Sequence, residues 1–180
     1  MQLQRLLSYT RKAVDDYHMI EDGDKIAIGV SGGKDSLTLL YALVKLQHFY
    51  PKKFSVIAVS VDLGYEDFDL TPVKELCSQL QVEYHIVKTQ IREIIFSDSN
   101  KGSPCSLCAK MRKGALNEAV KELGCNKVAY AHHMDDVIET MFLSLIYEGR
   151  FYTFSPVTFL DKAELTVIRP MIYVSEAEVK

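Results

Sequence analysis

Apolar positions along this chain follow two spacings, one typical of buried strands and one typical of helices. Short runs that are apolar on both faces predict strands over residues 25–30, 54–62, 82–87, 127–132 and 165–169. Residues at helical spacing predict helices over residues 2–19, 37–46, 70–81, 106–123 and 135–148. Because strands that are apolar on both faces need a helix layer on each side, we expect an α/β fold of three layers, α/β/α, around a parallel five-stranded sheet.

Composition places the chain among ordinary folded domains. Of its 180 residues, 48% are hydrophobic and 25% are charged, and the net charge is −3, which excludes a disordered chain. No apolar run approaches the ~18 residues of a membrane span, and the first residues carry no secretory signal. We therefore expect a cytoplasmic protein without membrane contact.

The sequence divides into one main domain with a short segment at each end. We expect residues 1–20 to form a mixed-charge helix that packs on the domain or on a second copy in a homodimer, and residues 21–174 to form the domain itself. Ser175 and Glu178 form a Ser-x-x-Glu capping box, which opens a helix over 175–180. One turn is too short to be stable alone, so we expect the 180 residues to be part of a longer protein.

The strongest candidate site is the loop Ser31-Gly-Gly-Lys-Asp-Ser36, which follows the first strand and precedes a helix. Its glycines let the backbone approach an anion, and the helix N-terminus offers free N–H groups. Ser31, Lys34 and Ser36 add hydroxyl groups and a positive charge. The loop differs from a Walker loop in the spacing of its glycines and in Asp35, which follows the lysine. An ordinary glycine-rich turn explains the glycines but not the whole string, so we expect a phosphate site.

Three other polar groups follow strands. Asp62 ends the second strand, where it can contact the sugar or base of a nucleotide or cap a turn. The run His132–Asp136 follows the fourth strand, and Arg169 ends the fifth. Because ligands of parallel sheets bind at the carboxyl ends of the strands, we expect these groups to meet the glycine-rich loop in one cleft.

The run His132-His-Met-Asp-Asp136 supports more than one interpretation. Asp135 is well placed as the N-cap of a helix over 137–148, which leaves one acid to face phosphates or their Mg²⁺. A zinc site is a weaker interpretation, because neighbouring histidines point in opposite directions in extended backbone. We expect at least one of the two histidines to be structural.

Together, these motifs resemble one known superfamily. Ser31–Ser36 resembles the PP-loop of the adenine nucleotide alpha hydrolase superfamily, whose fold is Rossmann-like (HUP-type). His132–Asp136 and Arg169-Pro170 resemble later motifs of its tRNA-modifying branch, and Pro104–Gly114 resembles the Cys-x-x-Cys stretch of the tRNA 2-thiocytidine synthetases. The resemblance implies that ATP and Mg²⁺ are bound by Ser31, Gly32, Gly33, Lys34, Asp35, Ser36, Asp62, His133, Asp136 and Arg169.

Cys105 and Cys108 are spaced to lie on one face of the first turn of a helix. A helix N-terminus and nearby cations favour the thiolate that an iron–sulfur cluster, a zinc ion or a persulfide needs. The alternative is a pair of small core residues. The resemblance implies a [4Fe-4S] cluster whose third cysteine follows the Arg-Pro motif, but this sequence has no cysteine after Cys125. Because a cluster takes three or four protein ligands, the third ligand is absent from this chain.

Lys110, Arg112 and Lys113 follow the cysteines without an intervening acid. A solvated helix face is the ordinary explanation of such a run. Beside a thiol pair, contact with RNA phosphates, here those of tRNA, is the better explanation.

These residues lead to the hypothesis of ATP-dependent tRNA thiolation. Lys34 and Asp35 are the expected catalytic residues for adenylation of a tRNA base, cytidine by resemblance, with Lys34 balancing charge as pyrophosphate leaves. Sulfur then arrives near Cys105 and Cys108, also expected to be catalytic, from a donor such as a cysteine desulfurase. The alternatives are a lysidine-type tRNA ligase, which needs no thiol pair, a non-catalytic adenine-nucleotide-binding module and a zinc-structured binding protein.

Overall fold

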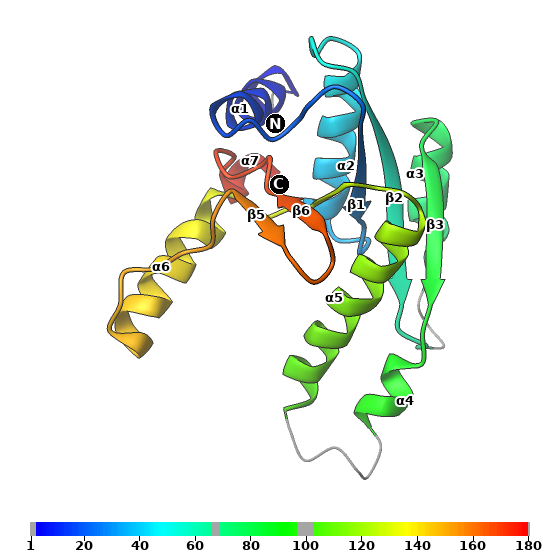
Figure 1. Cartoon of the computed structure of the whole chain (residues 1–180), viewed down its shortest axis with the longest axis vertical. Coiled ribbons are helices and arrows are strands. Elements are labelled where there is room, and N and C mark those ends of the chain that lie inside the picture. The colour runs from blue at the N-terminus through cyan, green and yellow to red at the C-terminus, as the bar shows by residue number, and fades with distance from the viewer. Residues whose placement is uncertain (1–2, 66–68, 97–102, 180) are drawn as a thin grey trace.

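The computed structural model describes residues 3–65, 69–96 and 103–179. Within them, six strands form one sheet in the order β3-β2-β1-β4-β6-β5, with helices on both faces (Figure 1). The parallel strands are β1 (Asp24–Gly29), β2 (Phe54–Asp62), β3 (Glu83–Lys88), β4 (Lys127–Ala129) and β6 (Leu165–Ile168). The expected three-layer α/β/α fold is confirmed.

The sheet has a sixth strand that the apolar pattern did not indicate. β5 (Val157–Leu160) lies at the edge and pairs antiparallel with β6. Its four residues are half-buried or exposed, so β5 lacks the apolar run that reveals a strand covered on both faces. The expected strand over 127–132 also ends earlier, at Ala129.

All five expected helices form, with ends shifted by a few residues. The helices are α1 (Leu3–Asp16), α2 (Lys34–Gln47), α3 (Thr71–Gln79), α4 (Ile91–Ile95), α5 (Pro104–Glu122), α6 (Met134–Glu148) and α7 (Glu176–Val179). The helix expected at residues 175–180 forms as α7, and the short helix α4 was not expected. The capping box before α7 is confirmed, since the Ser175 backbone N–H and hydroxyl each donate to Glu178 Oε2 at 3.0 Å. Residues 1–2 and Lys180 of the expected end segments lie outside the described residues. No helix in the described part is long and apolar enough to cross a bilayer.

Two hydrophobic clusters cover the two faces of the sheet. Ile26 and Ile28 of β1 join the cluster under α1 and α2, whereas Ala27 joins the cluster under α4 and α5. Successive strand residues point to opposite faces, so the burial of both clusters requires strands without polar alternation. This is the physical origin of the apolar runs in the sequence.

A buried ion pair joins the amino ends of β1 and β4, which are neighbours in the sheet. Lys127 Nζ lies 2.7 Å from Asp24 Oδ2 and donates to the Met19 carbonyl at 2.9 Å. Burial opposes ionisation of Asp24, but hydrogen bonds from the Glu21 amide, Lys127 and Asn126 outweigh it and hold the pKa of Asp24 below its usual value. The pair fixes the two strands whose opposite ends carry the candidate site.

Candidate functional site

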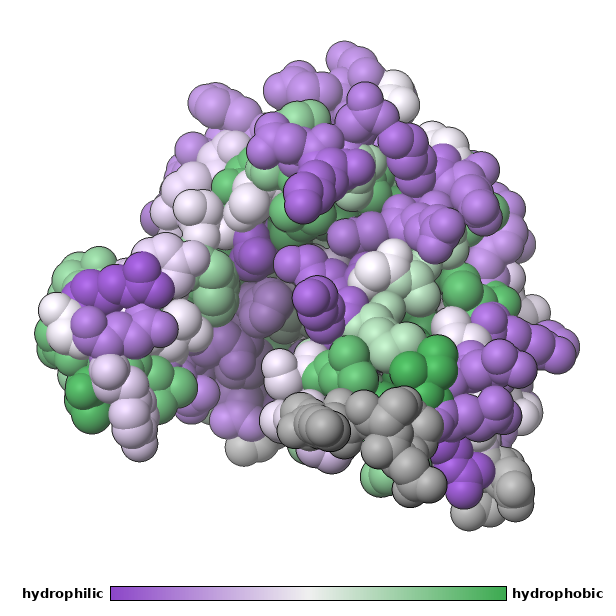
Figure 2. All heavy atoms as spheres, turned by 60° about the horizontal axis from the view of Figure 1, so that its bottom comes forward, coloured by the Kyte–Doolittle hydropathy of each residue, from purple (hydrophilic) through white to green (hydrophobic). Residues whose placement is uncertain are grey.

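The candidate site lies where the strand order reverses. After β1 the chain continues toward β2 and β3, and after β4 it continues toward β6 and β5, so the carboxyl ends of β1 and β4 flank a topological switch point. The ends of β2 and β3 point to the lower side of Figure 1, which Figure 2 turns forward. There the surface is hollowed beside the lobe formed by α6, and hydrophilic residues line the hollow (Figure 2).

The glycine-rich segment Ser31–Ser36 forms the turn after β1 and the first residues of α2, and Ser31, Gly32, Gly33 and Lys34 are exposed. Gly32 has a φ of +82°, in the left-handed region that glycine adopts without steric cost. Buried Ser36 holds the turn, because its hydroxyl donates to the Gly33 carbonyl at 2.9 Å and accepts from the Ser31 N–H at 3.2 Å. Gly33 is the N-cap of α2 and provides no capping side chain, so the start of α2 is suited to bind an anion.

Lys34 is the first residue of α2, and its ammonium lies between two carboxylates. Its Nζ lies 2.8 Å from Asp35 Oδ1 and 3.2 Å from Glu176 Oε1. The hydrogen bond to Asp35, with that to Glu176, raises the pKa of Lys34. Glu176 was not among the residues expected from the sequence. The sequence did indicate that Glu176 lies at a helix start, because the capping box at Ser175 opens α7 and makes Glu176 its first residue.

The start of α6 differs from the expected one. The N-cap of α6 is His133, which is 7% exposed, and not Asp135. Asp136 reaches back from the third helical position, and its Oδ2 accepts the His133 N–H at 2.8 Å. Asp135 Oδ2 instead accepts the Glu176 N–H at 2.6 Å. Both acids therefore stabilise helix starts, and Asp135 links α6 to the residue that contacts Lys34.

Arg169 is directed at the segment between α6 and β5. It is 9% exposed, and its Nη1 donates to the Ser155 carbonyl at 2.6 Å and to Thr158 Oγ1 at 3.2 Å. Its guanidinium lies 4.9 Å from the Phe154 ring centre, and the His132 ring packs on the same aromatic ring at 4.7 Å. Burial, together with the charge of Arg169, lowers the pKa of His132 and so favours the neutral imidazole. Through these contacts, Arg169 and His132 hold the segment that connects α6 to β5.

Asp62 caps a turn at the end of β2. Its Oδ1 accepts the Gly64 N–H at 2.9 Å, and its carbonyl oxygen accepts the Thr89 hydroxyl at 2.7 Å. The capping alternative is confirmed, and a contact with the nucleotide sugar remains a proposal.

The two cysteines of the Cys-x-x-Cys motif lie in the first turn of α5. Cys105 is exposed and Cys108 is half-buried. Cys77 and Cys125 are buried, and burial raises the pKa of both thiols, which disfavours the thiolate. Among the described residues, no group of three or more His, Cys, Asp and Glu side chains could hold a metal. The described residues therefore provide two candidate ligands and do not by themselves fit a [4Fe-4S] cluster.

Three exposed cations continue along the same helix: Lys110, Arg112 and Lys113. The N-terminal half of α5, which carries them, extends beyond the neighbouring strand ends (Figure 1).

Comparison with known proteins matches the chain to the PP-loop domain over residues 4–180. The chain is similar to the tRNA-cytidine(32) 2-sulfurtransferases of Geobacter sulfurreducens, with 40% identity over 93% of the chain, and of Pelobacter propionicus, with 42% identity over 98%. It spans 66% of the length of each of these relatives.

Solved structures agree with the fold. The U34-tRNA thiolase of Methanococcus maripaludis, solved with its [4Fe-4S] cluster, superposes with a TM-score of 0.76 at 25% identity, covering 96% of this chain and 60% of that one. The NH3-dependent NAD synthetase of Campylobacter jejuni superposes with a TM-score of 0.60 at 18% identity, covering 99% of this chain and 71% of that one.

Proposed function

Since this chain belongs to the PP-loop domain family, we propose that it binds ATP at Ser31–Ser36 and adenylates a tRNA base for sulfur transfer. The base proposed is cytidine, because the curated relatives at 40% and 42% identity are tRNA-cytidine 2-sulfurtransferases. One observation carries the proposal. The phosphate-binding turn after β1 and the thiol pair on α5 belong to elements that flank the same end of the sheet (Figure 1).

The adenylation step uses groups at the mouth of the turn. The ATP phosphates lie against the start of α2, and Lys34 balances the charge that develops on the leaving pyrophosphate. The carbonyl oxygen of the base attacks the α-phosphorus, the bond to pyrophosphate breaks, and the base becomes O-adenylated. Mg²⁺ supplies charge neutralisation between the phosphates, and Asp136 and Asp35 are the carboxylates proposed to face it. In the same proposal, Asp62, His133 and Arg169 surround the nucleotide.

Sulfur enters as a nucleophile beside Cys105 and Cys108. Hydrosulfide attacks the adenylated carbon, loses its proton as the C=S bond forms, and AMP leaves with the former base oxygen; when the donor carries a persulfide, a thiol reductant first releases the outer sulfur as hydrosulfide. This substitution is neutral in redox terms. The U34-tRNA thiolase carries a [4Fe-4S] cluster, but the two thiols described here do not complete such a site, so we route no step through it.

The proposed partners are tRNA, bound through Lys110, Arg112 and Lys113, and a sulfur donor such as a cysteine desulfurase. We place this chemistry in the cytoplasm, with residues 21–174 as the catalytic domain and residues 1–20 as a helix packed on it. α1 supports this division, because its buried residues Leu6, Ala13 and Val14 join the core cluster under α2.

The decisive experiment measures two products in parallel, pyrophosphate from ATP and thiolated base in tRNA. Wild-type protein with tRNA and sulfide is expected to form both. Lys34→Ala should abolish both products, whereas Cys105→Ser combined with Cys108→Ser should abolish thiolation and leave pyrophosphate release.

The control is Cys77→Ser, which changes a buried thiol away from the site. Thiolation that persists without Cys105 and Cys108 would refute the sulfur half of the proposal. Absence of tRNA-dependent pyrophosphate release from the wild type would refute the adenylation half.

A further inference from the structure

The ring of His132 is held by aromatic neighbours, and its buried Nδ1 has no hydrogen-bond partner among the described residues. The ring centre lies 4.7 Å from that of Phe154 and 6.0 Å from that of Tyr130, to which it stands nearly perpendicular. A buried nitrogen without a partner lowers stability. Proteins keep such exceptions mainly at sites that bind or react. Because His132 is only half-buried, a ligand can still reach part of its ring.

His132 faces the layer of the sheet that carries α5. The neighbouring ring of Tyr130 packs on the cluster under α4 and α5, and the Tyr130 hydroxyl donates to Asn117 Oδ1 of α5 at 3.4 Å. Residues two apart in extended backbone point to the same side, which agrees with the contact between the two rings. Lys113 of α5 is close enough for its charge to lower the pKa of His132. The imidazole therefore lies on the α5 side of the carboxyl end of β4.

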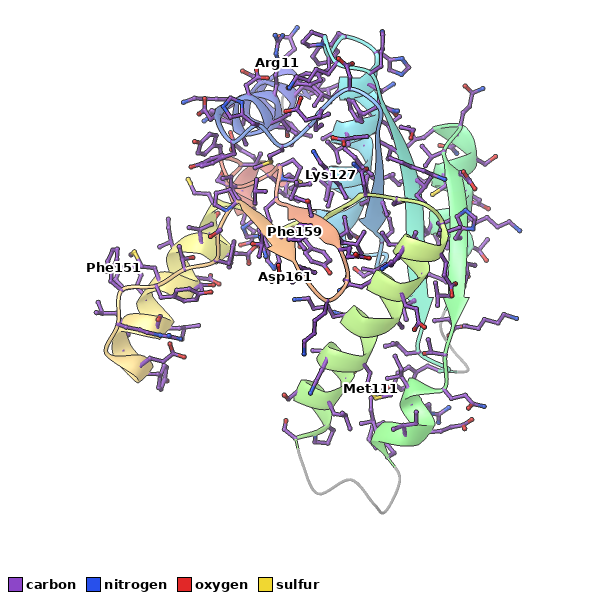
Figure 3. The ribbon with its side chains drawn as sticks, viewed as in Figure 1. Arg11, Met111, Lys127, Phe151, Phe159 and Asp161 are labelled. Carbon is purple, nitrogen blue, oxygen red and sulfur yellow. The ribbon has the colours of Figure 1, made fainter. Side chains whose placement is uncertain are left out.

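The side of α5 that bears Lys113 is turned away from α4. Met111 packs on the cluster under the two helices, and its side chain lies on the side of α5 that faces α4 (Figure 3). Two residues correspond to about 200° around a helix, so the exposed side chain of Lys113 lies on the opposite side. A cation suited to an RNA phosphate and the imidazole of His132 thus border the same space beside α5.

The proposed function requires the target base to lie between two elements of the site. Its carbonyl oxygen attacks an ATP held at the turn after β1, and its carbon is attacked by sulfur that arrives beside Cys105 and Cys108 on α5. β4 is a neighbour of β1, and His132 follows it on the α5 side. Adenine is expected in the other direction, because Asp62, proposed to contact the nucleotide sugar, ends β2 on the far side of β1.

The charge state of His132 suits a base better than a phosphate. Burial and the charge of Arg169 lower the pKa of His132 and favour the neutral imidazole. A neutral imidazole lacks the charge that attracts phosphate, but it can donate or accept one hydrogen bond at the polar edge of a base. Proteins hold unstacked RNA bases with hydrogen bonds to these edges and with aromatic rings, of which Tyr130 and Phe154 are two.

We propose that His132 hydrogen-bonds the polar edge of the target base and so orients the base carbonyl oxygen toward the α-phosphorus of ATP, with Phe154 and Tyr130 fixing the imidazole. This inference rests on the proposed function and deepens it, because it names a side chain that holds the base. The base leaves its stack in the tRNA to reach this position, as in other enzymes that act on a base.

Phenylalanine separates the hydrogen bond from the ring packing. His132→Phe keeps an aromatic ring beside Phe154 and Tyr130 but removes both nitrogens. It should lower tRNA-dependent pyrophosphate release at saturating ATP by about 10- to 100-fold, because the base edge loses its partner. The KM for ATP should not change, and the urea midpoint of unfolding should be unchanged or higher, because an unpartnered nitrogen is removed. His85→Phe, at a half-buried histidine of the edge strand β3, is the control and should leave turnover and KM unchanged.

The outcomes separate this contact from the function on which it rests. A wild type that releases no pyrophosphate in response to tRNA would refute the proposed function and this contact with it. An active wild type whose turnover is retained in His132→Phe would refute the contact alone. A raised KM for ATP in His132→Phe would show that the ring contacts ATP, which also overturns its assignment to the target base.

A second pair of variants keeps the test valid if His132→Phe is destabilised. His132→Gln and His132→Leu introduce side chains of similar size, of which only glutamine can form hydrogen bonds. With tRNA, His132→Gln should turn over about fivefold faster than His132→Leu or more. Equal turnover of the two variants would contradict the contact.

Discussion

The ammonium of Lys34, at the start of α2, lies 3.2 Å from the carboxylate of Glu176, the first residue of α7. Glu176 is held there through its own N–H, which donates to Asp135 of α6 at 2.6 Å. Glu176 therefore links α7 to both Lys34 of α2 and Asp135 of α6, three segments that are distant in the sequence. If ATP binds as proposed, its phosphate oxygens would seek the same ammonium, and Glu176 would compete with ATP for Lys34.

Removal of this competition should strengthen ATP binding. Glu176→Gln keeps the backbone N–H that bonds Asp135 but removes the negative charge beside Lys34. An exposed ion pair contributes up to about 1 kcal/mol, so the KM for ATP should fall by about two- to fivefold. Pyrophosphate-release kinetics measure this change. Glu164→Gln, which removes an exposed partner of Lys121, is the control and should leave the KM unchanged. A raised KM for Glu176→Gln would show that the carboxylate assists binding.

The left-handed backbone at Gly32 leads to a second prediction. Gly32→Ala forces an L side chain into a φ of +82°, at a cost of about 1–2 kcal/mol, and should raise the KM for ATP by about five- to thirtyfold. Gly114→Ala is the matched control, because a Cβ at this helical position meets no atom within 4 Å. That control should instead raise the unfolding midpoint slightly. An unchanged KM for Gly32→Ala would mean that the turn does not hold the phosphates.

The cations of α5 should determine the salt dependence of tRNA binding. Replacement of Lys110, Arg112 and Lys113 by alanine should weaken tRNA binding and reduce the slope of log affinity against log salt by about 1 for each phosphate that no longer meets a cation. ATP binding without tRNA should not change. Arg11→Ala combined with Lys53→Ala, two exposed cations on the side of the sheet away from the site, is the control. Equal effects of both sets would indicate attraction by overall charge instead of by this helix.

The buried pair Asp24–Lys127 should make stability depend on acid pH. The pKa of Asp24 is lowered in the fold, so its contribution is present above the unfolded value of about 4 and is lost as pH falls through the lower folded value. Asp24→Asn should cost about 3–5 kcal/mol at pH 7, because Lys127 is left buried without its partner. In urea unfolding, the difference between wild type and variant should shrink below about pH 4. A difference that stays constant down to about pH 2 would refute this assignment.

Local patterns in the sequence predicted most of the fold, and they singled out the loop Ser31–Ser36 and the pair Cys105 and Cys108 as candidates for the site. The strand over 54–62 has the predicted bounds, because all its neighbours are parallel strands and both of its faces are covered. The turn Ser31–Ser36 was predicted from residue types alone. Its left-handed backbone needs glycine at position 32, and the hydrogen bond that holds it uses the buried hydroxyl of Ser36.

Other features could not be read from local patterns. β5 is short and half-exposed, so its residues carry no strand periodicity. Asp135 and Asp136 both suit the start of a helix, and only the position of α7 decides that Asp135 bonds the Glu176 N–H while Asp136 caps α6. The orientation of Arg169 toward Ser155 likewise depends on the return path of the chain after α6.

By itself, the sequence determined the α/β/α fold, the glycine-rich turn after β1 and the two thiols at the start of α5, because each depends on contacts within a few residues or on burial of both faces of a strand. Only the tertiary structure showed that Asp135 and Asp136 accept backbone N–H groups and that Glu176 pairs with Lys34. It also showed that the described residues leave the apolar side chains of α6 uncovered. These features depend on which distant segments come together. A periodic pattern in the sequence indicates that an apolar side chain needs residues to pack against. Only the three-dimensional structure shows whether such residues are there.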